Sequence, residues 1–203
     1  MKMYVAKSDK SYHKVLREVI QIILDGGIVI YPTDTVYGIG CSAKNKDAVS
    51  KLVQLKRRQE KKPFSFICKD IATISQFAVI PNWAYRLMSK ALPGPYTFVL
   101  EARKTNLPKE LIGKRNTVGV RIPSNYLCNK MADLIDLPIV STSVNVAGEE
   151  SISRVDKLPT EFLNQVDAVI DAGPATSGPS TIVDATGKEP VVIREGFGKL
   201  FWL

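Results

Sequence analysis

Tyr31-Pro32-Thr33-Asp34-Thr35-Val36-Tyr37-Gly38-Ile39-Gly40 is the stretch around which this chain of 203 residues is organised. The apolar run 28–31 leads into it and predicts a buried strand that ends at a proline turn. The turn displays several hydroxyl groups and one carboxylate, that of Asp34. After a predicted helix the chain continues with the cationic residues Lys56-Arg57-Arg58 and Lys61-Lys62. Hydroxyls at the mouth of a strand, followed by cations, predict a site for anionic small molecules such as phosphates.

The composition favours a folded, basic protein. The length fits one large domain or two small ones, and 45% apolar residues are enough to bury a core. Lys and Arg number 28 against 20 Asp and Glu, so the net charge is +8. This charge favours anionic partners such as nucleotides or RNA, although a basic surface can also serve solubility alone.

The spacing of the cysteines and the absence of long apolar runs indicate the cellular compartment of the protein. The three cysteines, Cys41, Cys68 and Cys128, lie far apart, and no pair has the spacing of metal ligands. The first residues lack the apolar run of a signal peptide, and no apolar stretch approaches membrane-spanning length. We therefore expect a cytoplasmic protein without a membrane partner, whose cysteines are buried or incidental thiols.

Hydrophobic periodicity predicts alternating helices and strands. The expected helices cover residues 11–24, with Ser11 as the cap, 47–55, 71–77, 82–91 and 125–135. The expected strands cover residues 3–6, 27–31, 64–68, 96–102, 117–122, 137–141, 168–171, 181–184 and 191–194. The interleaving predicts one α/β domain over residues 1–203. Two regions, 96–122 and 168–194, have neighbouring strands without a helix between them, which favours a mixed parallel and antiparallel sheet.

Several common catalytic motifs are missing from the sequence. There is no phosphate loop of the form GxxxxGK[ST] and no GxGxxG. A Ser-His-Asp triad would need the single histidine, His13, which falls in the first turn of a predicted surface helix. The sequence therefore excludes the well-known phosphate loops and disfavours the common hydrolase machinery.

Polar side chains at predicted strand and helix ends are the remaining candidates. They are Thr33, Asp34, Thr35, Tyr37, Lys56, Arg58, Thr117, Arg121, Ser141, Ser143, Asn145, Ser180, Thr181 and Arg194. Each alone has an ordinary structural role, since hydroxyls cap turns and arginines solvate surfaces. Together they are typical of a ligand site at the strand ends of an α/β sheet. Arg121 suits a ligand carboxylate, and Thr35 and Ser141 suit an ammonium group.

Four blocks in these positions carry a resemblance to a known family. They are 31–40 (YPTDTVYGIG), Lys56-x-Arg58 with Lys62-Pro63, 117–123 (TVGVRIP) and 141–145 (STSVN). Supporting blocks are 92–100 (LPGPYTFVL), 179–184 (PSTIVD) and 193–196 (IREG). The sequence resembles the YrdC-like threonylcarbamoyl-AMP synthases, and within them the YciO branch, over nearly the whole chain.

The resemblance implies a twisted mixed sheet with a basic concave face. It implies a reaction that joins L-threonine, bicarbonate and ATP, with Mg²⁺ accompanying the ATP, into L-threonylcarbamoyl-adenylate and pyrophosphate. The residues implied for threonine are Thr35, Arg121, Ser141 and Ser180. Those implied for the nucleotide are Arg58, Lys62, Thr117, Ser143, Asn145, Ser151 and Arg194. Lys56 and Arg58 are the implied catalytic pair, and no protein residue is assigned to a metal.

Alternative functions remain open at this point. The chain could be a binding module for RNA, either tRNA or double-stranded RNA, or a family member that binds nucleotide without full synthase activity. The family also implies delivery of its product to a tRNA-modifying transferase. For Asp34, two roles are open: a turn residue that hydrogen-bonds its own backbone, which we favour, or a carboxylate near the metal.

Overall fold

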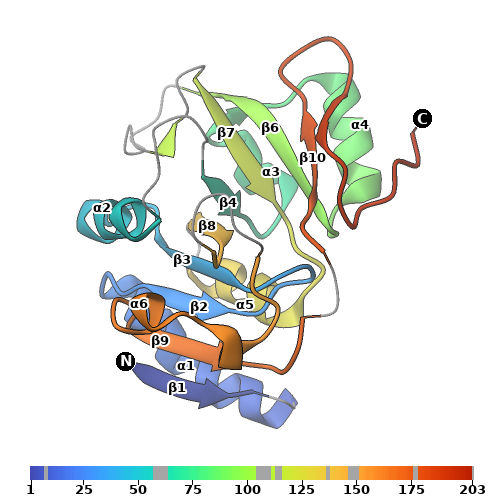
Figure 1. The fold of residues 1–203 in the computed structure, drawn as a ribbon. Helices are drawn as coiled ribbons and strands as arrows, with labels where there is room; N and C mark the ends of the chain where they lie inside the picture. The colour runs from blue at the N-terminus through green and yellow to red at the C-terminus, as the bar shows by residue number, and fades with distance from the viewer. Residues whose placement is uncertain are drawn as a thin grey trace.

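The computed structural model describes residues 1–6, 9–56, 64–103, 111–112, 116–135, 138–145, 151–175 and 178–202, with only the backbone at 9–11. The strands of these ranges join into one sheet (Figure 1). Its order is β1-β9-β2-β3-β8-β4-β7-β6-β10-β11, with β5 beside β6. The strands are β1 (Lys2–Val5), β2 (Val29–Tyr31), β3 (Gly38–Ser42), β4 (Ser65–Ile67), β5 (Ala78–Val79), β6 (Tyr96–Ala102), β7 (Thr117–Arg121), β8 (Ile139–Ser143), β9 (Ala168–Asp171), β10 (Thr181–Asp184) and β11 (Val191–Arg194).

The sheet is mixed, as the sequence predicts. The pairs β1–β9, β2–β9, β4–β7 and β6–β10 are parallel, and the other pairs are antiparallel. In Figure 1, β2, β3 and β9 run across the view, whereas β6, β7 and β10 run up it. The sheet is therefore strongly twisted, which agrees with the right-handed twist of ordinary strands.

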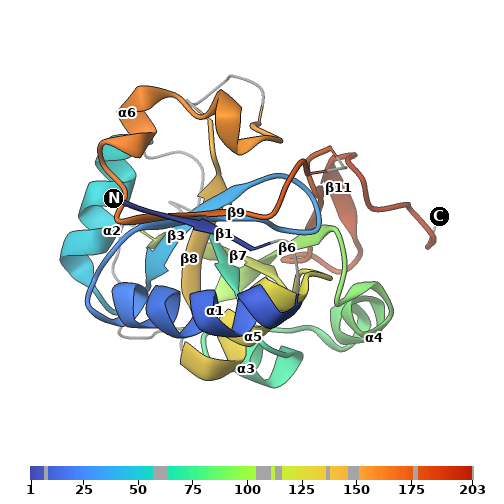
Figure 2. The ribbon, with the colours of Figure 1, turned by 90° about the horizontal axis from the view of Figure 1, so that it is seen from below.

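Helices cover both faces of this sheet. They are α1 (Asp9–Leu24), α2 (Lys46–Leu55), α3 (Ile71–Ser75), α4 (Asn82–Ala91), α5 (Tyr126–Ile135) and α6 (Thr160–Leu163). One core cluster joins α2, α3, α4 and α6 to alternate sheet residues such as Val140, Phe66 and Phe98. The other joins α1 and α5 to residues of the opposite face, including Tyr31, Ile67 and Ile139. Figure 2 shows α1 and α5 side by side. None of the described helices has the length and apolar character to cross a membrane.

The main difference from the predicted elements is β3. The sequence stretch 38–42 contains two glycines, which have low β propensity, and we assigned it no strand. In the structure β3 is fully buried and lies between β2 and β8 near the centre of the sheet. The chain thus makes a hairpin, with 32–37 as the loop, and the quoted stretch supplies the loop and most of the second strand.

Smaller differences concern the ends of elements. The first helix begins at Asp9, so the prediction that Ser11 caps it is wrong. Strand β8 begins two residues later than the predicted strand 137–141 and continues to Ser143, so Ser143 lies inside the sheet, as Ser141 does, rather than after it. Both side chains therefore point to the same face, which matters for the site below. A short helix, α6, lies in a region to which we assigned no helix.

Candidate functional site

The hairpin glycines make room for a buried tyrosine. A Cβ atom added at Gly40 would lie 2.3 Å from the carbonyl oxygen of Val140 and 2.9 Å from the hydroxyl of Tyr31. One added at Gly38 would lie 3.1 Å from the Tyr31 ring. The Tyr31 hydroxyl then donates a 2.7 Å hydrogen bond to Ser141 Oγ on β8. Glycine at these two positions therefore lets Tyr31 reach across β3 and orient Ser141.

The β2–β3 loop is held by its own hydroxyls. Thr33 Oγ1 donates to the Val36 carbonyl at 2.6 Å and accepts from the Thr35 backbone at 3.1 Å. Because the Thr33 hydroxyl proton is engaged there, Thr35 Oγ1 is the donor in the 3.0 Å contact between the two hydroxyls. Arg121 Nη2 donates to Thr35 Oγ1 at 3.1 Å. One acceptor position remains on the Thr35 hydroxyl.

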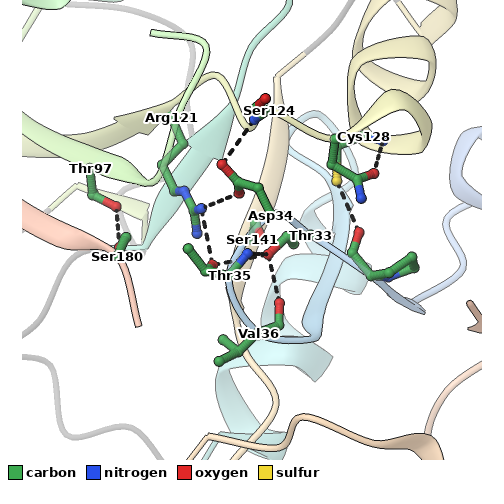
Figure 3. A network of polar contacts seen from close by, with 12 residues as sticks. Thr33, Asp34, Thr35, Val36, Thr97, Arg121, Ser124, Cys128, Ser141 and Ser180 are labelled. Carbon is green, nitrogen blue, oxygen red and sulfur yellow. Dashed lines mark hydrogen bonds and ion pairs between the residues drawn. The ribbon is translucent and has the colours of Figure 1, made fainter. Parts of the chain in front are cut away.

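Asp34 connects this loop to the end of β7. Its Oδ1 accepts from Arg121 Nη2 at 2.8 Å, and its Oδ2 accepts from the Ser124 backbone at 2.9 Å (Figure 3). The favoured prediction, that Asp34 hydrogen-bonds its own backbone in the turn, is wrong because Thr33 has that task. The ion pair is well shielded, with side-chain exposures of 12% for Arg121 and 8% for Asp34.

The loop has further ties to distant elements. The thiol of Cys128 on α5 donates to the Pro32 carbonyl at 3.2 Å. The hydroxyl of Tyr37 donates to the Gly173 carbonyl at 2.6 Å and accepts from the backbone of Ala172 at 3.1 Å. The loop is therefore fixed to both β7–α5 and the segment after β9.

A second arginine lies on the same face as Arg121. On β10, Ile182 pairs with Thr97 of β6 on one side and with Arg194 of β11 on the other. Strand β7, which ends at Arg121, is the neighbour of β6 on its other side. The side chains in such a row point to one face. Thr97 and the hydroxyl of Ser180 share a 2.8 Å hydrogen bond. Arg194 Nη2 and Nε donate to the Ser180 carbonyl at 2.7 and 3.1 Å.

The two guanidinium groups leave a donor without a partner. Burial lowers the pKa of Arg194, and the positive charge of Arg121 on the same face of the sheet lowers it further. Arg121 Nε is buried and has no hydrogen-bond partner within the described part of the chain. A buried N–H without a partner is costly, and a bound anion would satisfy it while offsetting the repulsion.

Lys56 follows α2, which packs on the sheet face opposite to that of Tyr31 and Ile67, and it is almost fully buried, with 4% exposure. Its Nζ donates to the carbonyl of Ser143 at 2.7 Å, to Asn145 Oδ1 at 3.0 Å and to the Asn145 carbonyl. Ser143 Oγ donates to Asn145 Oδ1 at 2.6 Å. Lys56 therefore fixes the end of β8. Ser143 is two residues beyond Ser141 on the same face, about 7 Å along the strand.

The structure brings together most of the residues named from the sequence. Of the set implied for threonine, Thr35 accepts a hydrogen bond from Arg121, Ser180 accepts one from Arg194, and Ser141 lies beside the β2–β3 loop. Arg194, which the resemblance implies for the nucleotide, lies with this set. Thr117 is on the same strand as Arg121, four residues away and on the same face. Ser151 lies near the end of β8, because the backbone N–H of the next residue, Ile152, donates a hydrogen bond to the carbonyl of Val144. Arg58 and Lys62 lie outside the described residues.

A family model described as "Telomere recombination" and named for the Sua5, YciO and YrdC proteins matches residues 21–196. The chain belongs to the Sua5–YciO–YrdC family. It is similar to the uncharacterized protein YciO of Escherichia coli strain K12, with 32% identity over 192 residues, 94% of this chain and 93% of the relative. The crystal structure of E. coli YciO matches with a TM-score of 0.91 at 31% identity, covering 99% of this chain and 98% of that one.

Other members of the Sua5–YciO–YrdC family are longer. The threonylcarbamoyl-AMP synthase of Pyrococcus abyssi is 32% identical over 179 residues, which cover 86% of this chain and 52% of the relative. The crystal structure of P. abyssi Sua5 complexed with L-threonine has a TM-score of 0.86 and 29% identity, covering 96% of this chain and 57% of that one. The chain thus spans about half of these Pyrococcus relatives.

Three residues that hold the candidate site residues in place were not predicted from the sequence. Tyr31, Thr97 and Ser124 were not among the candidates, yet each holds a candidate in place. Tyr31 and Thr97 lie inside predicted strands, where period-2 alternation could have placed them on the face of the hydroxyls. Ser124 contributes only its backbone N–H, a group that every residue except proline carries, so no side-chain pattern could reveal it.

Asp34 does not offer a metal site. No group of three or more metal-binding side chains exists among the described residues. Both oxygens of Asp34 are engaged, one by Arg121 and the other by Ser124. That no protein residue ligates a metal stays a prediction, under which a magnesium ion accompanying ATP would take phosphate and water oxygens as ligands.

Proposed function

We propose that this chain is an L-threonylcarbamoyl-adenylate synthase. It joins L-threonine, bicarbonate and ATP, and releases pyrophosphate and water. The observation that carries the proposal is the buried, unpartnered Nε of Arg121 beside Arg194, in a family with members that bear this activity in their names. Two guanidinium groups next to hydroxyl acceptors are the chemistry that recognises an α-amino acid.

The amino acid would bind through its carboxylate and its amine. Arg121 Nε and the neighbouring Arg194 donate to the carboxylate, and the remaining acceptor position of Thr35 Oγ1 takes a hydrogen bond from the amine. Thr35 is fully shielded from solvent, so a ligand reaches its hydroxyl only when the segments over it move apart. A ligand bound there is enclosed, which strengthens its electrostatic contacts.

The nucleotide would bind toward Ser143 and Asn145. Lys56 holds these residues through their backbone and side-chain oxygens, so its role is to position them as well as to add charge. Arg58 and Lys62 follow Lys56 in the sequence and supply the cations that a polyphosphate requires. The predicted contacts of Thr117 and Ser151 belong to this nucleotide region.

The chemistry then requires positioning rather than a covalent enzyme intermediate. The free amine of threonine attacks the carbon of bicarbonate, and loss of water gives the carbamate. A carbamate oxygen attacks the α-phosphorus of ATP, and the bond to pyrophosphate breaks. Holding the carbamate next to the α-phosphate supplies the main advantage. Cations near the leaving pyrophosphate stabilise the charge that develops there.

Pyrophosphate release tests this proposal. The purified protein, with Mg-ATP and bicarbonate, should release pyrophosphate only when L-threonine is added. Arg121→Gln should lower kcat/KM for threonine by on the order of a hundredfold or more, because a charged hydrogen bond to the carboxylate is lost. Arg86→Gln, an exposed arginine on α4, is the matched control and should leave turnover unchanged. Pyrophosphate release that ignores threonine would reject the proposal.

RNA binding, with tRNA or double-stranded RNA, stays a second prediction. It rests on the net charge of +8. Electrostatic RNA binding should weaken steeply between low and physiological salt. A salt titration with a tRNA and a double-stranded RNA of equal length checks it, and no binding at low salt would reject it. Transfer of the product to a tRNA-modifying transferase likewise stays a prediction.

A further inference from the structure

The charges at the carboxylate end of the site do not cancel. Among the described residues, Arg121 and Arg194 each contribute one positive charge to the shared face, and Asp34 contributes one negative charge. Their sum is a single positive charge. This matches a ligand group that carries one negative charge, such as a carboxylate, and leaves a doubly charged phosphate uncompensated.

We propose that Asp34 determines the specificity of this end of the site, so that it accepts a monoanionic carboxylate and rejects a dianion such as the phosphate groups of the second substrate. This deepens the proposed function and rests on it, because a synthase that binds an amino acid and ATP on one face must keep the two anions apart. Asp34 acts through Arg121 and is a specificity-determining and positioning residue, not a catalytic one.

Burial gives the Asp34 charge its influence. Asp34 and Arg121 are only 8% and 12% exposed in their side chains, so solvent screens their charges weakly. Removing the Asp34 charge would leave two positive charges on one face of the sheet without a counter-charge, and a dianion offsets them better than a monoanion. The preference between monoanion and dianion should therefore follow the charge at position 34.

A purely structural role for Asp34 makes a different prediction. The carboxylate ties the β2–β3 loop to β7 and to Ser124, and the Cys128 thiol ties the same loop to α5 through the Pro32 carbonyl. Cys128→Ala loosens this junction without changing any charge. If Asp34 acted only by holding the loop, both variants should change anion binding in the same way.

The test compares two tetrahedral anions that differ in charge, sulfate and methanesulfonate. Binding is measured at constant ionic strength through the Nε–Hε NMR resonance of Arg121, assigned from the spectrum of Arg121→Lys. In the natural protein methanesulfonate should bind at least as tightly as sulfate. Asp34→Asn should shift the preference toward sulfate by about tenfold or more, the size expected for one charge at a shielded site. Arg194→Gln, which removes a positive charge, should shift it toward methanesulfonate.

The outcomes separate an effect of the Asp34 charge from an effect of loop fixation. Cys128→Ala should keep the preference of the natural protein. An unchanged preference in Asp34→Asn, an equal shift in Cys128→Ala, or no anion binding in any of the proteins would overturn the inference. If Asp34→Asn fails to fold, Arg194→Gln alone decides, because an unchanged preference there contradicts the charge model. Since neither anion is a substrate, failure of threonine-dependent turnover would reject the proposed function without altering this result.

Discussion

Tyr31 and Ser141 are joined by a hydrogen bond of 2.7 Å, although 110 positions separate them in the chain. The Tyr31 side chain is fully buried, and burial raises its pKa, so the hydroxyl keeps its proton and remains a donor. Ser141 accepts this bond with one lone pair and retains its own proton for a ligand. The contact thus links the first strand of the hairpin to a candidate binding residue.

Replacing Tyr31 by Phe should lower the free energy of unfolding by about 1 kcal/mol, because a buried hydrogen bond is lost and Ser141 loses its donor. Tyr4→Phe is the matched control. The Tyr4 hydroxyl also donates to a side chain, Glu18 at 2.8 Å, but lies near the surface and should contribute less. Urea denaturation of the two variants measures the difference in the free energy of unfolding. Equal effects would mean that burial of the Tyr31 hydrogen bond does not increase its contribution to stability.

Gly40→Ala should destabilise the protein by about 1–3 kcal/mol or more, the usual cost of overpacking. Its new methyl group would lie 2.3 Å from the Val140 carbonyl oxygen, and neighbouring sheet strands hold that backbone in place. Gly178→Ala has nothing within 4 Å and should leave stability unchanged. Thermal unfolding compares them, and a Gly40→Ala protein as stable as the natural one would contradict the close packing of Tyr31 across β3.

Lys56→Met should lower the free energy of unfolding by about 2–4 kcal/mol, since hydrogen bonds from a charged group to the end of β8 are lost in a buried place. Lys51→Met, at an exposed position of α2, the helix that Lys56 caps, should change the free energy of unfolding by less than about 0.5 kcal/mol. Chemical denaturation at pH 7 makes the comparison. Similar small effects in both variants would mean that Lys56 is not a structural clamp.

The three cysteines should resist alkylation in the folded protein at pH 8. All three are buried; burial raises the pKa of Cys41 to about 12 and raises the pKa of the Cys68 and Cys128 thiols as well. Each folded-state pKa lies above its usual value, so the reactive thiolate stays scarce until the pH rises well beyond 8. Mass spectrometry after iodoacetamide should find no label in the native protein and three labels in urea. Rapid native labelling would contradict this burial.

The sequence predicted regular elements well where periodicity and propensity agree. The bounds of α4, β6, β9, β10 and β11 are those expected. The sequence did not predict β3. Glycine at positions 38 and 40 leaves the space that the Tyr31 side chain needs, and this requirement comes from a tertiary contact. A local pattern cannot reveal such a contact.

The sequence named candidate site residues, whose roles stay predictions, but it did not show how they are connected. Several of the hydroxyls and arginines named at strand ends lie together in the structure. The partner of Asp34 was not foreseeable, because Arg121 comes 87 positions later and only the sheet order brings them together. The turn preference of aspartate, a local rule, therefore gave the wrong role, and the longer-range ion pair prevailed.

The product formed with ¹³C-bicarbonate tests the proposed synthase most directly. The protein is incubated with L-threonine, Mg-ATP and labelled bicarbonate, and the quenched mixture is analysed at once by mass spectrometry. A threonylcarbamoyl-adenylate that carries the ¹³C label, and that is absent with Arg121→Gln, is the expected result. Pyrophosphate release without a labelled adduct, or an unlabelled threonyl-adenylate, would contradict the proposed reaction.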